Sequence, residues 1–290
     1  MNKQTRVWLV LSIALSLLAI GSSCGGSKNE NTGGGGNSTA SAGPYSGPTG
    51  TISGVISFEG TPPAPKKIDT AADPVCGQKN PNLMTDDTVV KDGKLANVFV
   101  YVKEGTVDGG KKIADYTWDP PSTPLKLDQN GCHYVPHVMG VMVNQKIQIT
   151  NSDATQHNIH WTPKNNPEWN QSQPNGAPPI EKTFGRAEVL VPVKCNQHPW
   201  MKSYIGVLKH PLFDVSKDTG AYEIKGVPPG KYTVVAWHEG GAPEKTMEVT
   251  VTANGAAKAD FSFGGAATSS NAPSSLQMMP AIEFPMLGKH

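Results

Sequence analysis

Alternating hydrophobic and polar positions predict a chain built from β-strands. From residue 51 onward, short runs of apolar and β-branched residues are bounded by Gly, Asn or Pro. Such boundaries and a period of two are typical of strands. No segment shows a sustained helical period, so the expected fold class is all-β. The predicted strands are residues 51–58, 95–102, 138–150, 188–193, 203–208, 221–224, 231–237 and 245–252.

Pro-rich segments separate these runs and are expected to form loops. They occupy residues 61–65, 119–124 and 174–179, and residues 164–179 as a whole are polar enough to predict a long surface loop. The tail, residues 264–290, begins with small and polar residues of low complexity. We expect it to be disordered or loosely packed.

The first 24 residues have the layout of an export signal. Two basic residues precede an apolar run of 14 residues, 7–20, which is too short for a membrane span of about 20 residues. The run ends in small residues before Cys24 and resembles a lipoprotein processing box, although Gly21 stands where that box has Leu. The resemblance implies lipidation of Cys24 in a bacterial lipoprotein, periplasmic or on the cell surface. Ordinary cleavage to a soluble secreted protein is the alternative.

Residues 25–50 are rich in Gly, Ser and Asn and contain almost nothing that can be buried. Such a segment behaves as a flexible coil with a root-mean-square reach of about 28 Å. We expect a tether on which a folded domain meets partners at a membrane surface.

Charge is nearly balanced, with 25 Lys and Arg against 24 Asp and Glu, and basic stretches do not exceed two residues. This pattern argues against nucleic acid as a partner. High contents of Gly (31) and Pro (25) favour turns and linkers over a helical bundle.

The chain has four cysteines, Cys24, Cys76, Cys132 and Cys195. If Cys24 is lipidated, three remain in an oxidising compartment, and the simplest partition pairs Cys76 with Cys132. Closing that loop would contribute about 4 kcal/mol. Two buried thiols are the alternative. A bound metal would explain how Cys195 stays unoxidised.

The chemistry concentrates in Cys195-x2-His198-x2-Met201, which offers a thiolate, an imidazole and a thioether within seven residues. Soft sulfur donors favour copper over hard cations. A tight turn between two strands would bring the three donors together. His157 is the candidate for a second imidazole, with two His and one Cys in a plane and Met on the axis.

Three alternatives stay open at this point. His160 lies on the same strand end as His157 and could replace it. Zinc could bind two His and one Cys, although an axial Met argues against it. A Cys, a His and a Met could also share a core without any metal.

The segments around His157 and Cys195 resemble the copper-binding segments of the cupredoxins, and the short loop is most similar to the amicyanin type. The resemblance covers residues 133–209 and implies a Greek-key β-sandwich with one copper ion. Residues 51–132 match less well and include an insertion that carries Cys76. We therefore assign residues 51–212 to a cupredoxin-like domain with an N-terminal insertion.

The resemblance also implies a role for each ligand. His157 is expected as the buried equatorial imidazole, Cys195 as the thiolate and Met201 as the axial thioether. His198 is expected as the partly exposed imidazole through which the electron leaves.

Three neighbours complete the site that the resemblance implies. Asn158 would fix the loop and donate its backbone N–H to the sulfur of Cys195. Pro199 and Trp200 would form an apolar docking surface beside His198.

Residues 213–263 resemble the carboxypeptidase regulatory-like modules, which are small transthyretin-type β-sandwiches. The resemblance lies in a turn at 218–220, the strand at 221–224, the segment Gly-Val-Pro-Pro-Gly at 226–230 and the strand at 231–237. These modules are usually non-catalytic, so we expect a structural unit in which His238 is a structural or surface side chain.

Electron transfer by a non-enzymatic copper protein, with copper cycling between Cu(I) and Cu(II), is the leading hypothesis for function. Its partners would be a redox protein at the membrane surface and, through the lipid anchor, the membrane itself. Delivery or storage of copper and a metal-free module that binds glycans or proteins are the alternatives. The chain lacks the His-x-His pairs of a multicopper oxidase, and the sequence does not specify an oligomeric state.

Overall fold

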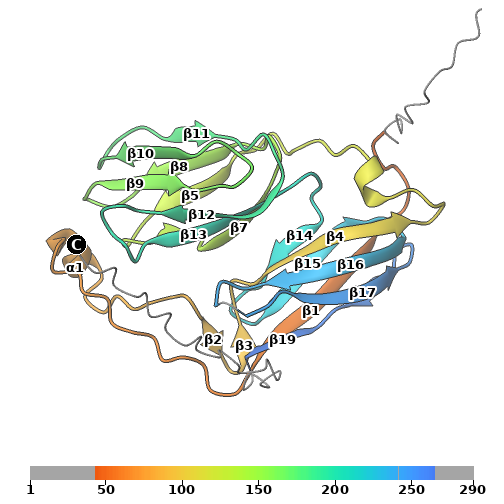
Figure 1. Cartoon of the computed structure of the whole chain (residues 1–290), viewed down its shortest axis with the longest axis horizontal. Coiled ribbons are helices and arrows are strands. Elements are labelled where there is room, and N and C mark those ends of the chain that lie inside the picture. The colour runs from red at the N-terminus through yellow and green to blue at the C-terminus, as the bar shows by residue number, and fades with distance from the viewer. Residues whose placement is uncertain (1–42, 241, 265–290) are drawn as a thin grey trace, which may run out of the picture. The chain divides into compact units, whose positions relative to one another are not determined.

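The computed structural model describes residues 43–240 and 242–264, and its strands form four sheets (Figure 1). The predicted signal with Cys24, the tether up to residue 42 and the tail from residue 265 lie outside the described residues. Over these described residues the fold is all-β, as predicted, with two short helical segments. Among the described residues, no helix has the length and apolar character needed to cross a membrane.

The middle of the chain forms two sheets, which we call the central sandwich (green in Figure 1). One sheet has the order β10-β9-β12-β13-β7 and the other the order β11-β8-β5-β6. The strands are β5 (Leu125–Gln129), β6 (Tyr134–Val135), β7 (Val138–Met142), β8 (Ile147–Asn151), β9 (His157–Trp161), β10 (Trp169–Gln173), β11 (Ile180–Lys182), β12 (Glu188–Lys194) and β13 (Lys202–Leu208).

Both sheets of the central sandwich bury alternate side chains in one shared core. Leu127 and Ile149 enter it from one sheet, and Ile159, Val193 and Ile205 enter it from the other. Each of these side chains is almost fully removed from solvent. The predicted period of two therefore produces the core that holds the sandwich together.

Two segments of the central sandwich differ from the sequence prediction. The single run 138–150 is split into β7 and β8 by a turn in which Asn144 has a φ of 64°, a conformation that Asn tolerates. The predicted loop 164–179 contains the strand β10, which pairs with β9. This polar segment is a strand because its backbone forms hydrogen bonds with β9, and not because it has an apolar pattern.

The remaining strands form the second pair of sheets, which we call the flanking sandwich. One sheet has the order β15-β1-β3-β2, with β18 and β19 also paired to β1, and the other has the order β14-β4-β16-β17. The strands are β1 (Gly50–Glu59), β2 (Val90–Lys91), β3 (Lys94–Leu95), β4 (Phe99–Val107), β14 (Phe213–Val215), β15 (Ala221–Val227), β16 (Gly230–Trp237), β17 (Lys245–Val251), β18 (Ala256–Lys258) and β19 (Phe261–Gly264).

Strand pairing corrects the predicted domain boundary between residues 212 and 213. β1 pairs with β15, and β4 pairs with β16 along its length. Both N-terminal strands thus belong to the sandwich that residues 213–263 complete, and the central sandwich is inserted between β4 and β14. This pairing depends on backbone hydrogen bonds between distant segments, which the local pattern of side chains does not encode.

Between β1 and β2 the chain carries a six-residue helix, α1 (Pro74–Lys79). Asp73 caps it by accepting the N–H groups of Val75 (2.9 Å) and Cys76 (3.3 Å), and Pro74 occupies the first turn, where no partner for its nitrogen is needed. A 3-10 turn, η1 (Ile113–Asp115), follows β4. Both segments are too short to produce a helical period in the sequence.

The structure joins Cys76 to Cys132, the pairing that the cysteine count favours, with a Cα–Cα distance of 5.7 Å. Cys132 precedes β6, so the disulfide fastens α1 to the central sandwich. Cys195 is a free, buried thiol.

Candidate metal centre

Two strand ends bring the predicted ligands together. His157 opens β9, and Cys195 directly follows β12, which pairs with β9. The turn from Cys195 to Met201 is closed by two hydrogen bonds, from the Cys195 N–H to the Met201 carbonyl (3.2 Å) and from the Met201 N–H to the His198 carbonyl (2.9 Å). The tight turn expected between two strands is present.

The donor atoms of three predicted ligands converge on one point. Nδ1 of His157 lies 2.9 Å from Nδ1 of His198, and Sγ of Cys195 lies 3.6 Å from the same His198 nitrogen. All three donor atoms lie within 4.8 Å of one another. The three side chains are buried, so together they can hold one metal ion away from bulk solvent.

Met201 is fully buried and belongs to the same core cluster as Cys195. Its backbone hydrogen bonds to Cys195 and His198 place it on the ligand turn. Its axial role stays a prediction.

Asn158 holds the Cys195 turn in place. Its side-chain oxygen accepts the N–H of Asn196 (2.7 Å) and lies 3.2 Å from Sγ of Cys195. The expected bond from its backbone N–H to the sulfur of Cys195 stays a prediction.

The surroundings of Cys195 favour its ionised form. Burial opposes ionisation, but hydrogen bonds from His157, His198 and the backbone outweigh it and lower the pKa of Cys195 to about 6. At neutral pH the sulfur is therefore largely a thiolate, the form that binds metals.

The outer nitrogen of His157 is held by a fully buried carboxylate. Nε2 of His157 lies 2.9 Å from Oδ2 of Asp153. Asp153 also accepts Nζ of Lys79 (2.6 Å) and the N–H groups of Gly131 and Cys132 (2.8 Å each). Burial opposes the charge of Asp153, but these donors outweigh it and hold its pKa well below the usual range.

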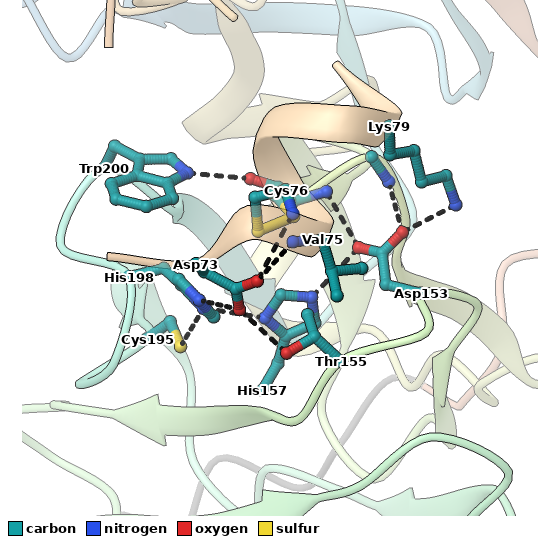
Figure 2. Close-up of a disulfide and its surroundings, with 12 residues drawn as sticks. Asp73, Val75, Cys76, Lys79, Asp153, Thr155, His157, Cys195, His198 and Trp200 are labelled. Carbon is teal, nitrogen blue, oxygen red and sulfur yellow. Dashed lines mark hydrogen bonds and ion pairs between the residues drawn. A yellow bond between two sulfur atoms is a disulfide. The ribbon is translucent and has the colours of Figure 1, made fainter. Parts of the chain in front are cut away.

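The outer nitrogen of His198 is held in the same way by the residue that caps α1. Nε2 of His198 lies 2.9 Å from Oδ2 of Asp73, which also accepts the hydroxyl of Thr155 (2.8 Å), as Figure 2 shows. Burial opposes ionisation of Asp73, but the bonds from Thr155 and His198 lower its pKa.

This arrangement fits a metal ion. When Nε2–H donates to a carboxylate, the lone pair of each imidazole is on Nδ1, which faces the other donors. The same carboxylates and the Cys195 thiolate overcome the effect of burial and raise the pKa of His157 and His198. The hydrogen bond between the two Nδ1 atoms requires one proton, which metal binding would displace.

The structure corrects the predicted exposure of His198. Its relative exposure is 4%, so the ring is buried rather than partly exposed. Asp73 and α1 cover its outer edge.

Two further groups of donor atoms lie around the disulfide. The sulfur of Cys76 lies within 4.8 Å of the donor atoms of Asp73 and His198, and the sulfur of Cys132 lies within 4.8 Å of the donor atoms of Asp153 and His157. Both sulfurs are in the disulfide, so these two groups are not separate metal sites.

Trp200 and Pro199 lie beside His198, and their role as a docking surface stays a prediction. Pro199 is exposed, and the half-buried Trp200 ring lies 5.1 Å from the His198 ring. Nε1 of Trp200 donates to the carbonyl of Cys132 (3.1 Å), which ties the ligand turn to the disulfide.

His160 does not join the three converging donors. Its Nδ1 lies 3.0 Å from the side-chain oxygen of Asn196, and its Nε2 contacts Glu168. His238 is buried and accepts the N–H of Gly240 (3.1 Å), a structural arrangement.

His133 and His137 share one carboxylate partner. In the structure, Nδ1 of each lies 3.3 Å from Oδ2 of Asp86, and Nε2 of His137 contacts Glu239.

Asp73 and Asp153 are the site residues that sequence reasoning missed. Each had a local signal: Asp153 stands four residues before His157, and Asp73 precedes a Pro, a typical start of a helix. Neither signal links the carboxylate to an imidazole.

The sequence model of a family described as "Polysaccharide lyase family 4, domain II" matches residues 213–259. This match covers part of the flanking sandwich. The matching family differs in name from the carboxypeptidase regulatory-like modules that residues 213–263 resemble. No curated protein matches the chain at a significant level.

Several solved structures align with part of the chain. A copper-containing nitrite reductase from Thermus scotoductus SA-01 is 19% identical over 29% of this chain and 22% of its own, with a TM-score of 0.27. A purple cupredoxin from Nitrosopumilus maritimus is 20% identical over 29% of this chain and 98% of its own, with a TM-score of 0.25. A reduced amicyanin variant is 18% identical over 36% and 99%, with a TM-score of 0.27. Similarity at this level carries no argument about function.

Proposed function

We propose that this chain is a mononuclear type 1 copper protein that transfers single electrons at the cell envelope. One observation carries the proposal: a buried thiol and two imidazole Nδ1 atoms converge while each Nε2 is held by a carboxylate. Two His, one Cys and a weak axial Met are the ligands typical of a blue copper site. We propose His157, Cys195, His198 and Met201 in these roles.

The chemistry of the donors favours copper over zinc. Structural zinc sites bind four strong ligands, and a catalytic zinc keeps a position open for water. Here the fourth candidate is the thioether of Met201, a soft and weak ligand that suits copper. All four side chains are buried, which leaves water little access to an open position.

The residues of the chain would keep the site rigid during electron transfer. Copper bound here would supply a one-electron couple between Cu(I) and Cu(II). Asp153 and Asp73 prevent rotation of the two imidazole rings, and Asn158 fixes the cysteine turn. Ligands that cannot move keep a similar geometry in both oxidation states, so little rearrangement accompanies the electron.

We further propose that the electron passes between His198 and a redox protein through the surface formed by Pro199 and Trp200. The Trp200 ring contacts His198 and is the partly exposed aromatic side chain on the ligand turn. We propose an exported lipoprotein that is anchored through Cys24, with a flanking sandwich that is structural and no catalytic activity of its own.

Copper delivery or storage would use the same ligands but would require rapid exchange. The burial of His198 under Asp73 and the disulfide favours retention. Potentiometry combined with copper-release kinetics separates the two functions. A reversible couple with slow copper loss is expected for electron transfer, whereas rapid loss to a chelator would support copper handling.

A further inference from the structure

We infer that Asp73 is a positioning residue that closes the metal site: fixed by α1 and the Cys76–Cys132 disulfide, it holds the outer nitrogen of His198 and shields the ligand from solvent. The inference rests on the proposed function, since it assigns a role toward the same copper ion. It adds a residue from the insertion, outside the segment that resembles the cupredoxins.

The two oxygens of Asp73 act in different directions. Oδ1 accepts the N–H groups of Val75 and Cys76 at the start of α1, and Oδ2 accepts Thr155 and His198. A residue that only capped the helix would need one oxygen and would have no reason to be largely buried. The Asp73 side chain is 14% exposed, because its second oxygen faces the site (Figure 2).

The segment that carries Asp73 is anchored on the other side of the site as well. Lys79, at the end of α1, donates to Asp153 (2.6 Å) and to Asn130 (3.0 Å). Asp153 in turn holds His157. Each end of α1 is thus connected to a carboxylate that holds the outer nitrogen of a proposed ligand. Asp73 holds His198 at the start of the helix, and Lys79 contacts Asp153 at its end.

The disulfide fixes the segment formed by Asp73 and α1, which we call the cover, in place over His198. Cys76 lies in α1 and Cys132 precedes β6, and the carbonyl of Cys132 accepts the indole N–H of Trp200 on the ligand turn. The disulfide and this hydrogen bond therefore connect three segments: the cover, the segment around Cys132 and the ligand turn. His198 cannot rotate outward without breaking its bond to Asp73.

Two consequences follow for a bound copper ion. Copper leaves slowly, because release requires the His198 ring to separate from the ion while Asp73 holds it in place. The negative charge of Asp73 makes the imidazole a stronger donor and favours Cu(II), which lowers the reduction potential.

Asp73→Asn tests the inference in the full chain loaded with Cu(II), with Asp69→Asn as a matched control. Asn still caps a helix and accepts a hydrogen bond but lacks the charge. Asp69 is exposed in the same segment, and its side chain accepts the N–H of Ala71. The readouts are the rate of copper loss to excess chelator and the reduction potential.

We expect Asp73→Asn to keep the thiolate-to-copper absorption band, to lose copper about 10- to 100-fold faster and to have a higher potential. Asp69→Asn should match the wild type. Asp73→Ser, which also keeps a capping oxygen, replaces Asp73→Asn if that variant does not fold.

Equal rates and potentials in Asp73→Asn and wild type would overturn the inference while leaving the proposed function intact. A wild-type protein that never shows the absorption band would instead remove the proposed function, and the role of Asp73 with it.

Discussion

Nε2 of His198 lies 2.9 Å from Oδ2 of Asp73, although the two residues are 125 positions apart in the chain. The ligand comes from the turn after β12, and the carboxylate comes from an insertion between β1 and β2. The candidate copper site is therefore assembled from two distant segments.

Removal of the disulfide should loosen the cover. In Cys76→Ser/Cys132→Ser we expect the free energy of unfolding to fall by about 4 kcal/mol, because a crosslink between residues 56 positions apart no longer restricts the unfolded chain. Copper loss to a chelator should accelerate as well, since α1 is held by one anchor fewer. Urea unfolding and stopped-flow chelation measure the two effects.

For urea unfolding of the metal-free protein, Cys195→Ser is the control, since it removes a sulfur without removing a crosslink. For copper release, where Cys195 is itself a proposed ligand, the control is Asp69→Asn at an exposed position. A double variant that unfolds and releases copper like the wild type would show that the disulfide does not hold the cover.

Replacement of Asp153 should destabilise the protein even without metal. Asp153 is fully buried and accepts four donors, from Lys79, Gly131, Cys132 and His157. Asp153→Asn turns an amide toward donors that need an acceptor, so we expect a loss of about 3–5 kcal/mol in the free energy of unfolding of the apoprotein.

Asp119→Asn, at an exposed position, should change the same quantity by less than about 0.5 kcal/mol. If both variants unfold alike, the Asp153 network does not stabilise the fold.

Stability should also decrease at alkaline pH because of His137. Burial opposes the charged form of His137, but Asp86 and Glu239 outweigh it and raise its pKa from 6.5 to about 9. A raised pKa means that the stabilisation is fully present below pH 6.5 and is lost as the pH rises through 9. The shift corresponds to about 3 kcal/mol at most.

The check compares urea unfolding of wild type and His137→Gln from pH 6 to 10. We expect the difference in stability between the two proteins to shrink across this range. A constant difference would mean that His137 does not carry the charge that its partners favour.

Local spacing was sufficient to predict which three donor atoms converge. The donors of Cys195 and His198 lie in one short turn, and His157 opens a strand that pairs with the strand before that turn. Short-range geometry and the soft chemistry of the side chains therefore identify the converging donors. The alternation of apolar residues was likewise sufficient for the all-β class.

Long-range pairing was not predictable in the same way. β1 pairs with strands about 170 to 200 positions later, such as Ile52 with Ile224 and Ile56 with Phe261. Asp73 reaches His198 only because the fold and the disulfide bring the insertion over the site. A sequence pattern that reports the period of one strand carries no information about such partners, and the predicted exposure of His198 was wrong for this reason.

The proposed function requires that Cys195 bind copper as a thiolate, and a visible absorption spectrum of the copper-loaded protein shows whether it does. After addition of one equivalent of Cu(II) to the purified chain, we expect an intense thiolate-to-copper charge-transfer band in the wild type and no such band in Cys195→Ser. A wild-type protein that stays colourless, or a band that survives in Cys195→Ser, would rule out coordination of copper by this thiolate.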